Sequence, residues 1–398
     1  MSALRIIMLA PFGIRPKGTL SARMLPLARA LVRRGHSVSI IAPPVHNPQD
    51  AGRRELYDGV PVTHTALPTL PSPLGAVQQV AALLRPALAE QPDVLHLFKP
   101  KGYSGLAALL ARAVLPQLPL VVDTDDWEGW GGWNDLQPYP RLARQLFAWQ
   151  ERDLPRRAAA VTVASRTLES QVWGFGVAPG QVFYLPNGVD RMESAELRIE
   201  NHFVRDADSQ FTLLLYTRFW ELDVRDVVAA LLAIVAGCPA ARLLVIGRGE
   251  RGEEQELLRL ARRAGVAAAI DYRGWVEPAQ IPALLTSADV ALAPMDDTLI
   301  NRARGLAKLL ELMAAGLPIV AGRVGQAAEY IEDGHSGLLV PPGDPAALAR
   351  ATLALLADAS LRTRLGQGAR ERVARCYTWE QLAPHAEAAY ERARQLHR

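Results

Sequence analysis

Short apolar runs alternate with longer stretches of helical periodicity along most of this chain. Buried strands of a parallel sheet read as continuous apolar runs, whereas amphipathic helices repeat apolar residues every three or four positions. In the first half, strands are predicted at Arg5–Ala10, Ser37–Ala42, Val62–Ala66, Val94–Phe98, Leu118–Thr124, Ala160–Ala164 and Val182–Leu185. Helices are predicted between them at Ser21–Arg34, Leu74–Ala89, Gly105–Val114 and Leu142–Arg157. Such alternation predicts a doubly wound α/β sheet, which binds ligands at the carboxyl ends of its strands.

The alternation stops at Asn187-Gly188, a turn signal, and a polar, charge-rich run continues to about Gln210. It then resumes with strands predicted at Phe211–Tyr216, Arg242–Gly247, Ala269–Tyr272, Val290–Ala293, Pro318–Ala321 and Leu338–Val340. Helices are predicted at Val227–Val235, Glu253–Gly265, Pro278–Ser287 and Pro345–Ala357. We therefore expect two Rossmann-like domains, 1–188 and 189–376, whose parallel sheets face a central cleft.

Composition describes an ordinary globular protein. A chain of 398 residues, 49% hydrophobic and 21% charged, can bury a core in each of two domains. The formal net charge of +3 is too small to indicate a nucleic-acid partner. Cys238 and Cys376 fit neither a metal site nor a disulfide framework, and the N-terminus has no signal-peptide pattern. The most apolar window is interrupted by Gly237, Pro239 and Arg242, so we expect a cytoplasmic protein without a membrane span.

The segment Gly305–Gly325 carries the clearest functional pattern. Its apolar residues recur at helical spacing, and Gly316 lies where a helix would end in a left-handed cap. Helix N-termini in parallel α/β folds bind anions, and Lys308 would add a cation in the first turn. Glu311, one turn later, is an acceptor suited to the vicinal hydroxyls of a ribose. The alternative is that both charged residues lie on a solvated helix face.

This segment resembles the nucleotide-sugar signature of retaining glycosyltransferases of family 4, also called glycosyl transferases group 1, which have the GT-B fold. The resemblance implies that Glu311 binds the donor ribose and that backbone N–H groups at Gly305, Leu306 and Ala307 hold its diphosphate. The first glutamate of the signature is replaced here by Ala303. The tail resembles the closing helix of the family, so 377–398 is expected to pack back on the first domain.

The stretch YTRFWELDVRD resembles the element of the family that neutralises the departing diphosphate. Arg218 matches its arginine, whereas the usual lysine position falls on Asp223. Arg225 or Lys308 would have to supply the missing cation. The expected catalytic residues are therefore Arg218 and Lys308, together with Asp126 on the acceptor side.

Three further glycine-containing loops resemble donor-site loops of the family. They contribute Gly18 and Thr19 after the first strand, Gly247 in the second domain, and Trp275, which would flank the base or simply pack. The stretch Gly247–Gly252 also matches the dinucleotide fingerprint GxGxxG. That fingerprint belongs after the first strand of a Rossmann domain, and this one follows a second strand, which disfavours a dehydrogenase.

The stretch DTDDWEGWGGWND combines carboxylates with three tryptophans at the end of a predicted strand. Tryptophan faces stack on sugar C–H groups and carboxylates accept from sugar hydroxyls, so we expect an acceptor site. Its residues would be Asp125, Trp127, Trp130 and Trp133. A tryptophan-rich lid that only packs on the domain is the alternative. Asp126 replaces the histidine of the family and would assist the acceptor hydroxyl. The acids could also suggest a metal site, but the GT-B resemblance argues against a metal role.

Basic residues collect near the N-terminus, at Arg15, Lys17, Arg23, Arg29, Arg33 and Arg34. A solvated face is the simpler interpretation, but such a face would also allow a peripheral contact with the inner membrane. The resemblance as a whole implies transfer of a sugar from a nucleoside-diphosphate sugar to a sugar or lipid-linked acceptor, without metal or other cofactor. Two alternatives remain: a sugar-nucleotide epimerase on the same fold, and a degenerate, non-catalytic member that partners a transferase.

Overall fold

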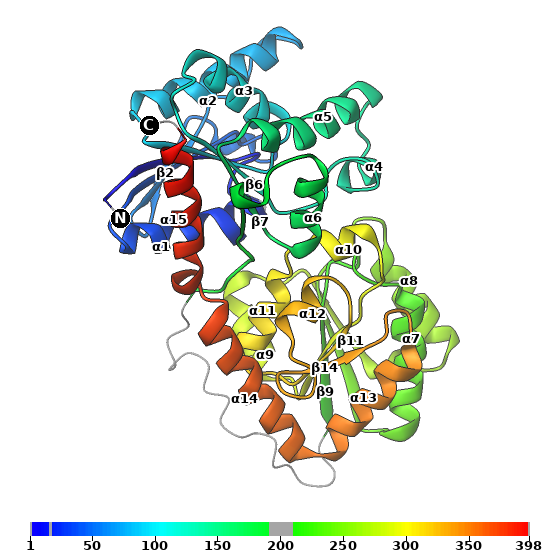
Figure 1. Cartoon of the computed structure of the whole chain (residues 1–398). Coiled ribbons are helices and arrows are strands. Elements are labelled where there is room, and N and C mark those ends of the chain that lie inside the picture. Colours follow the sequence, from blue (N-terminus) through cyan, green and yellow to red (C-terminus); the bar gives the residue numbers. More distant parts are fainter. Residues whose placement is uncertain (1, 16–17, 191–209, 397–398) are drawn as a thin grey trace. The chain divides into compact units, whose positions relative to one another are not determined.

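The computed structural model describes residues 2–15, 18–190 and 210–396, and the predicted connection from Asn187 to Gln210 falls largely outside them. The chain forms two compact units, each built around its own sheet (Figure 1). The first unit comprises Met1–Asp190, Ala303–Gly305 and Trp379–Arg398, and the second comprises Arg191–Arg302 and Leu306–Thr378. The last helix, α15 (Trp379–Gln395), therefore belongs to the first unit, although it ends the chain.

The described part of the first unit contains an eight-stranded sheet in the order β3-β4-β2-β1-β5-β6-β7-β8. Its strands are β1 (Arg5–Leu9), β2 (Ser37–Ala42), β3 (Arg54–Tyr57), β4 (Val60–His64), β5 (Val94–Phe98), β6 (Leu120–Thr124), β7 (Ala160–Val163) and β8 (Val182–Tyr184). All neighbours pair in parallel except β3 and β4. The antiparallel edge strand β3 was not predicted, and it differs from the expected purely parallel sheet.

Both faces of this sheet are covered by helices because successive residues of each strand point to opposite sides. Ile6 and Met8 pack with α1 (Leu25–Arg33) and α15, whereas Ile7 and Leu9 pack with helices of the other face. Those helices are α2 (Leu74–Ala89), α3 (Gly102–Val114), α5 (Arg141–Arg157) and α6 (Arg166–Gly174). The region predicted as one helix, Ser21–Arg34, begins as a π-helical turn at Leu20–Met24 before α1.

The described part of the second unit contains a six-stranded parallel sheet in the order β11-β10-β9-β12-β13-β14. The strands are β9 (Phe211–Tyr216), β10 (Ala241–Ile246), β11 (Ile270–Gly274), β12 (Val290–Ala293), β13 (Ile319–Gly322) and β14 (Leu338–Val340). In chain order this is 3-2-1-4-5-6, the order of a doubly wound dinucleotide-binding sheet. The predicted strands of this half are confirmed, with shifts of a residue or two at their ends.

Helices cover this second sheet as well. They include α7 (Val224–Gly237), α8 (Glu253–Arg263), α9 (Ile281–Thr286), α10 (Leu299–Ala303), α11 (Ala307–Ala314), α12 (Gln326–Tyr330), α13 (Pro345–Ala357) and α14 (Ala359–Cys376). Asp344 caps α13 by accepting from the backbone N–H of Ala347, and Pro345 occupies the first helical position, where no hydrogen bond is lost. Across the described residues, none of the helices combines the length and the apolarity that crossing a bilayer would require.

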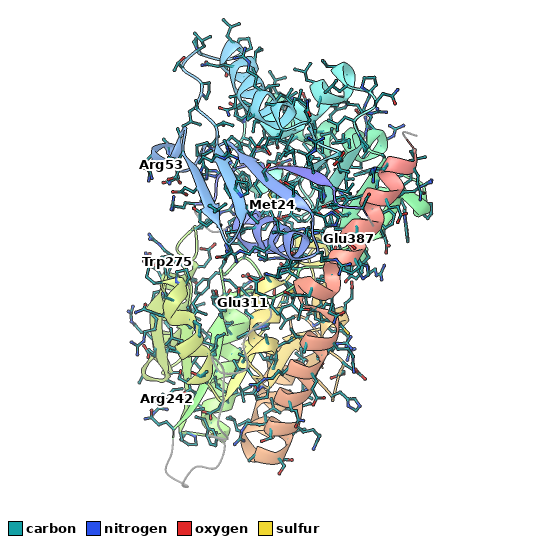
Figure 2. All side chains as sticks on the ribbon, turned by 90° about the vertical axis from the view of Figure 1, so that its left-hand side faces the viewer. Met24, Arg53, Arg242, Trp275, Glu311 and Glu387 are labelled. Carbon is teal, nitrogen blue, oxygen red and sulfur yellow. The ribbon has the colours of Figure 1, made fainter. Side chains whose placement is uncertain are left out.

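The closing helix α15 is fixed to the first unit by polar as well as apolar contacts. The Tyr390 hydroxyl lies 2.9 Å from His96 Nδ1 inside the unit, and both side chains are buried. At the surface, Arg34 donates two hydrogen bonds, of 2.7 and 2.8 Å, to the carboxylate of Glu387, which Figure 2 labels on this helix. The segment that ends the chain is thus part of the first core.

Candidate active site

In each sheet the chain first builds strands on one side of its first strand and then continues on the other side. The place where the strand order reverses is a topological switch point. Ligands of open α/β sheets bind outside the carboxyl ends of the strands at such points. In the first sheet the switch lies between β1 and β5, and in the second between β9 and β12. Lys99 directly follows β5, and Tyr216 is the last residue of β9.

Lys99 is the centre of a buried charge cluster at the first switch point. Its Nζ lies 2.6 Å from Asp126, 2.9 Å from Glu128 and 3.5 Å from Asp125. Burial alone would lower the pKa of Lys99, but these three carboxylates together raise it well above the usual value. Its backbone has φ of +54°, a left-handed conformation uncommon for a residue with a side chain. The ammonium group is therefore a fixed charge that holds the predicted acceptor-side acids.

The carboxylates of this cluster differ in electrostatic state. Burial raises the pKa of Asp125 to about 6, although Lys99 opposes this change. Burial would also raise the pKa of Glu128, but Lys99 and Lys101 lower it to about 2. Thr19 donates a 2.7 Å hydrogen bond to Asp125. The side chain of Thr19, expected at the donor, thus contacts a predicted acceptor residue, while Gly18 N–H is bonded to Ser21 Oγ at 3.0 Å.

The three tryptophans lie in a tight loop that leads into the short helix α4 (Trp133–Leu136), of which Trp133 is the first residue. The indole N–H of Trp127 donates to the backbone carbonyl of Trp130 at 3.0 Å, and the backbone N–H of Trp133 donates to the backbone carbonyl of Trp127 at 2.9 Å. Trp130 is 59% exposed, whereas Trp127 and Trp133 are half-buried. Trp130 is therefore the tryptophan of this loop best placed to stack on a ligand.

Glu151 on α5 anchors this tryptophan loop, and sequence reasoning missed it. Its two carboxylate oxygens accept from the backbone N–H groups of Glu128 and Gly129, at 2.7 and 2.9 Å. A Cβ at Gly129 would lie 2.2 Å from Glu151 Oε2, so a larger residue there would displace this carboxylate. Burial raises the pKa of Glu151 to about 7. No signal in the sequence distinguishes this glutamate from other helical acids.

A second buried polar network fixes the strand that leads into the cluster. Arg23 is 1% exposed and grips Asp123 with two hydrogen bonds, of 2.6 and 2.8 Å. It also donates to the Leu185 carbonyl at 2.7 Å and to Asn187 at 3.0 Å. Asp123 accepts a further hydrogen bond, of 2.6 Å, from Thr162. The network orients the end of β6, from which the acidic stretch continues.

Because Arg23 is buried, it does not belong to the predicted basic N-terminal surface. Other members of that predicted face pair with acidic side chains. These pairs are Arg15 with Asp50, Arg29 with Asp58 and Asp190, Arg33 with Glu380, and Arg34 with Glu387. Lys17 lies outside the described residues. The described arginines thus form ion pairs, and they do not make a free basic face.

In the second unit, α11 brings Lys308 and Glu311 to the carboxyl end of β9. Lys308 Nζ lies 4.5 Å from the ring centre of Tyr216, and the Tyr216 hydroxyl donates a hydrogen bond to the Glu311 carboxylate. All three side chains are half-buried, so each retains access to solvent. Sequence reasoning identified the two helical residues but missed the tyrosine beneath them.

The start of α11 differs from the prediction. The helix begins at Ala307, with Leu306 as its N-cap, and not at Gly305. The side chain of Leu306 does not accept a hydrogen bond from any first-turn N–H group. Gly305 is grouped with the first unit, where a Cβ would lie 2.5 Å from Asn187 Nδ2. The predicted cap at Gly316 is confirmed by its φ of +74°.

The remaining donor-side predictions lie at neighbouring strand ends of the same sheet. Arg218 follows β9 and is exposed, where it pairs with Glu250 at 3.1 Å. Gly247 follows β10 with φ of +127°, and a Cβ there would lie 1.7 Å from the Thr217 carbonyl. Trp275 follows β11 and is 64% exposed. Figure 2 shows Trp275 and Glu311 toward one end of the second unit, opposite Arg242 at the start of β10.

Asp223 and Ala303, the two residues that depart from the family signature, each have a structural role in this chain. Asp223 caps α7 by accepting from the backbone N–H of Arg225 at 2.8 Å, and it also pairs with the Arg225 guanidinium. Arg225 is therefore engaged with Asp223, which leaves Lys308 as the better replacement for the missing lysine. Ala303 is fully buried in an apolar cluster of the first unit. A glutamate at that position would place a charge in this cluster.

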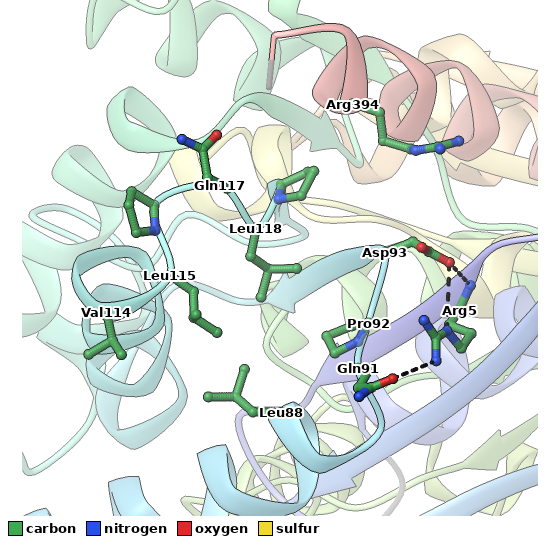
Figure 3. A pocket seen from close by; sticks show the side chains of 12 residues that line it. Arg5, Leu88, Gln91, Pro92, Asp93, Val114, Leu115, Gln117, Leu118 and Arg394 are labelled. Atoms are coloured by element: carbon green, nitrogen blue, oxygen red, sulfur yellow. Dashed lines mark hydrogen bonds and ion pairs between the residues drawn. The ribbon is translucent and has the colours of Figure 1, made fainter. Parts of the chain in front are cut away.

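A separate pocket lies at the opposite edge of the first sheet from the Lys99 cluster. This pocket of about 610 Å³ lies at the amino ends of β1 and β5, lined by Leu88, Val114, Leu115 and Leu118 (Figure 3). Arg5 and Asp93 pair at its edge. Within the described residues, no group of three or more histidine, cysteine or acidic side chains could hold a metal ion.

Comparisons with known proteins bear on the family and the fold of this chain. Two family models match the chain, "Glycosyl transferase 4-like domain" over residues 18–188 and "Glycosyl transferases group 1" over residues 210–358. The phosphatidyl-myo-inositol mannosyltransferase of Mycolicibacterium smegmatis is 28% identical over 402 residues, which cover 98% of this chain and 94% of the relative. Among solved structures, sucrose-phosphate synthase from Thermosynechococcus elongatus has a TM-score of 0.75 at 21% identity, with 99% of both chains covered. HepE of Anabaena in complex with UDP has a TM-score of 0.69 at 17% identity, with 96% of this chain and 98% of that chain covered.

Proposed function

Because this chain belongs to the glycosyl transferases group 1 family and has the GT-B fold, we propose that it transfers a sugar from a nucleoside-diphosphate sugar to an acceptor hydroxyl with retention of configuration. One observation carries the proposal. Lys308 and Glu311 lie side by side on the first two turns of α11, at the carboxyl end of the switch-point strand β9. A cation, a helix N-terminus and a hydroxyl acceptor are three features that suit a nucleoside diphosphate.

The donor diphosphate is bound by charge rather than by metal in this proposal. The first-turn N–H groups of α11 and the Lys308 ammonium neutralise the phosphates, and Arg218 moves from Glu250 to the leaving group. Glu311 accepts from the ribose hydroxyls, and Trp275 flanks the base. The UDP in the HepE structure supports a nucleotide donor for this fold.

The acceptor is a sugar or a glycolipid head group, bound by the first unit. Trp130 supplies an exposed aromatic face, and Asp126, fixed by Lys99 at 2.6 Å, accepts from the reacting hydroxyl. The name of the mannosyltransferase relative supports a lipid-linked acceptor and a peripheral position at a membrane. The catalytic contribution of the first unit is therefore to orient one hydroxyl and to exclude others.

A second candidate, a non-catalytic member that binds a nucleotide and partners an active transferase, is favoured by two residues. Ala303 is buried and Asp223 caps a helix, so two charged groups of the family signature are absent. Binding of a nucleotide sugar without consumption in the presence of sugar and lipid acceptors would support this candidate.

The proposal is tested by thermal unfolding with UDP, GDP, ADP and dTDP. A nucleotide at a hundred times its dissociation constant stabilises the folded state by about 2.7 kcal/mol. For a unit of this size, that corresponds to a rise in Tm of about 5 to 10 °C. Glu311→Ala should abolish most of the rise, whereas Glu256→Ala, which removes a partly exposed glutamate paired with Arg259 on α8, should leave it intact.

The nucleotide that raises the Tm then determines which nucleoside-diphosphate sugars are assayed for turnover. Release of the nucleoside diphosphate that depends on an acceptor, with a product of retained configuration, is the expected result. If none of the four nucleotides raises the Tm of the wild-type protein, the donor site is not functional and the transferase proposal is wrong.

A further inference from the structure

Tyr216 occupies the position at which an open α/β sheet meets its ligand, yet the proposed reaction has given it no role so far. It is the last residue of β9, the first strand of the second sheet in chain order, and pairs with Ile246 of β10. On the other side, the preceding residue Leu215 pairs with Leu292 of β12. The side chain therefore stands at the switch point itself.

One aromatic side chain contacts both charged residues of α11. Lys308 and Glu311 are three residues apart and so share a helix face. The Lys308 ammonium lies over the Tyr216 ring, 4.5 Å from its centre, a distance at which the negative ring face attracts a cation. The Tyr216 hydroxyl donates to the Glu311 carboxylate. The ring and the hydroxyl thus act on two different partners.

These contacts matter because lysine and glutamate side chains are long and flexible. Holding each in a single rotamer upon binding costs conformational entropy, and a contact already present in the free protein removes that cost. Burial, with a smaller contribution from Glu311, raises the pKa of Tyr216, so its hydroxyl stays protonated near neutral pH. The hydroxyl then acts as a donor to the carboxylate, and a carboxylate can accept several hydrogen bonds.

We propose that Tyr216 is a positioning residue of the donor site, whose hydroxyl orients Glu311 toward the ribose hydroxyls of a nucleoside diphosphate while its ring holds Lys308. This inference rests on the proposed function, because it assigns the ribose to Glu311. It predicts that the effect of the Tyr216 hydroxyl on binding depends on the presence of ribose hydroxyls in the ligand.

The test compares wild type with Tyr216→Phe, which keeps the ring under Lys308 and removes only the hydroxyl. Dissociation constants are measured by calorimetry for whichever of UDP, GDP and ADP binds wild type, and for its 2′,3′-dideoxy analogue. Tyr216→Phe should weaken the ribonucleotide about tenfold and the dideoxy analogue less than twofold. In a Glu311→Ala background, Tyr216→Phe should have no further effect on the ribonucleotide.

The matched control is Tyr57→Phe, which removes a tyrosine hydroxyl that donates to a glutamate carboxylate, that of Glu55, at the edge strand β3. It should leave both ligands unchanged. Equal weakening of the ribonucleotide and of its dideoxy analogue by Tyr216→Phe would show a merely structural role and overturn the inference. So would unchanged binding of both ligands, and neither result would touch the proposed function. If no nucleotide binds wild type, the proposed function fails and the inference fails with it.

Discussion

Removing Arg23 should destabilise the first unit far more than removing an exposed arginine with the same hydrogen-bond geometry. Arg23 and Asp123 are 1% and 0% exposed, and two hydrogen bonds, of 2.6 and 2.8 Å, join them. The variant Arg23→Met leaves the Asp123 carboxylate buried, with Thr162 as its remaining neighbour in that network. Breaking one partner of a buried ion pair costs about 3–5 kcal/mol, because the other charge stays desolvated.

The matched control is Arg34→Met in the same unit. Arg34 also grips a carboxylate with two hydrogen bonds, but its side chain is 41% exposed, so loss of its pair should cost about 1 kcal/mol or less. Scanning calorimetry measures both variants, fitted to two transitions because the chain has two compact units. The Tm of one transition should fall by about 6 to 20 °C for Arg23→Met.

The double variant Arg23→Met, Asp123→Asn separates the buried charge from the lost contacts. Asparagine removes the charge and retains a similar shape, so the double variant should be more stable than Arg23→Met alone. Equal small losses for Arg23→Met and Arg34→Met would refute the reasoning. A double variant less stable than Arg23→Met would show that the unpaired charge is not the source of the loss.

Two more predictions concern the tryptophan loop. Burial raises the pKa of Glu151 to about 7, from an ordinary value of 4.5, so its contribution to stability is present below pH 4.5 and is lost as the pH rises through 7. Between pH 4.5 and 8 this loss amounts to about 3 kcal/mol. In urea unfolding at several pH values, wild type should therefore lose about 3 kcal/mol more than Glu151→Gln, in which Asp125 still titrates; parallel profiles for the two proteins would contradict it. Trp130 is 59% exposed, so Trp130→Ala should leave the Tm within about 2 °C and raise the KM for the acceptor roughly tenfold, as measured by initial rates. A change in the donor KM instead would place this tryptophan elsewhere.

Most strands could be predicted because parallel strands are buried on both faces. Val94–Phe98 is buried at every position and reads as one apolar run. Strand β3 was missed because its residues alternate between exposed and half-buried, with no run to detect. It forms because Asp58 and Gly59 have φ of +49° and +85° and so close a tight hairpin onto β4. The Asp58-Gly59 pair is therefore a hairpin signal that the sequence itself contains.

Helix α14 was missed for a different reason. Its sequence is polar and contains Gly366 and Gly368, which lower helix propensity and resemble loop signals. A Cβ at either glycine would lie 2.1 Å from a backbone carbonyl, of Gly316 and His335 respectively. The glycines are therefore sites of close packing, and the contacts that require them are distant in sequence. A local sequence pattern therefore cannot predict these contacts.

The residues of the candidate site also differ in whether the sequence could identify them. Glu311 and Lys308 could be identified because the signature is local to one helix, with both residues on one face. Arg23 and Tyr216 could not, because their roles depend on partners 100 and about 95 residues away. Arg23 was grouped with surface arginines because charge is the only property the sequence shows, whereas burial follows from the network around Asp123.

The charges at the two switch points suit different halves of the proposed reaction. In the first unit, three carboxylates face two lysines, and burial keeps the pKa of Asp125 near 6, so the cluster has no surplus of positive charge. Such a cluster accepts from hydroxyl groups, and it would repel a phosphate. In the second unit, the N-terminus of α11 and the cation of Lys308 favour an anion, and the Glu311 carboxylate accepts a hydrogen bond from Tyr216. The charges within each unit, taken separately, therefore support the proposal of a neutral acceptor hydroxyl on the first unit and an anionic diphosphate on the second.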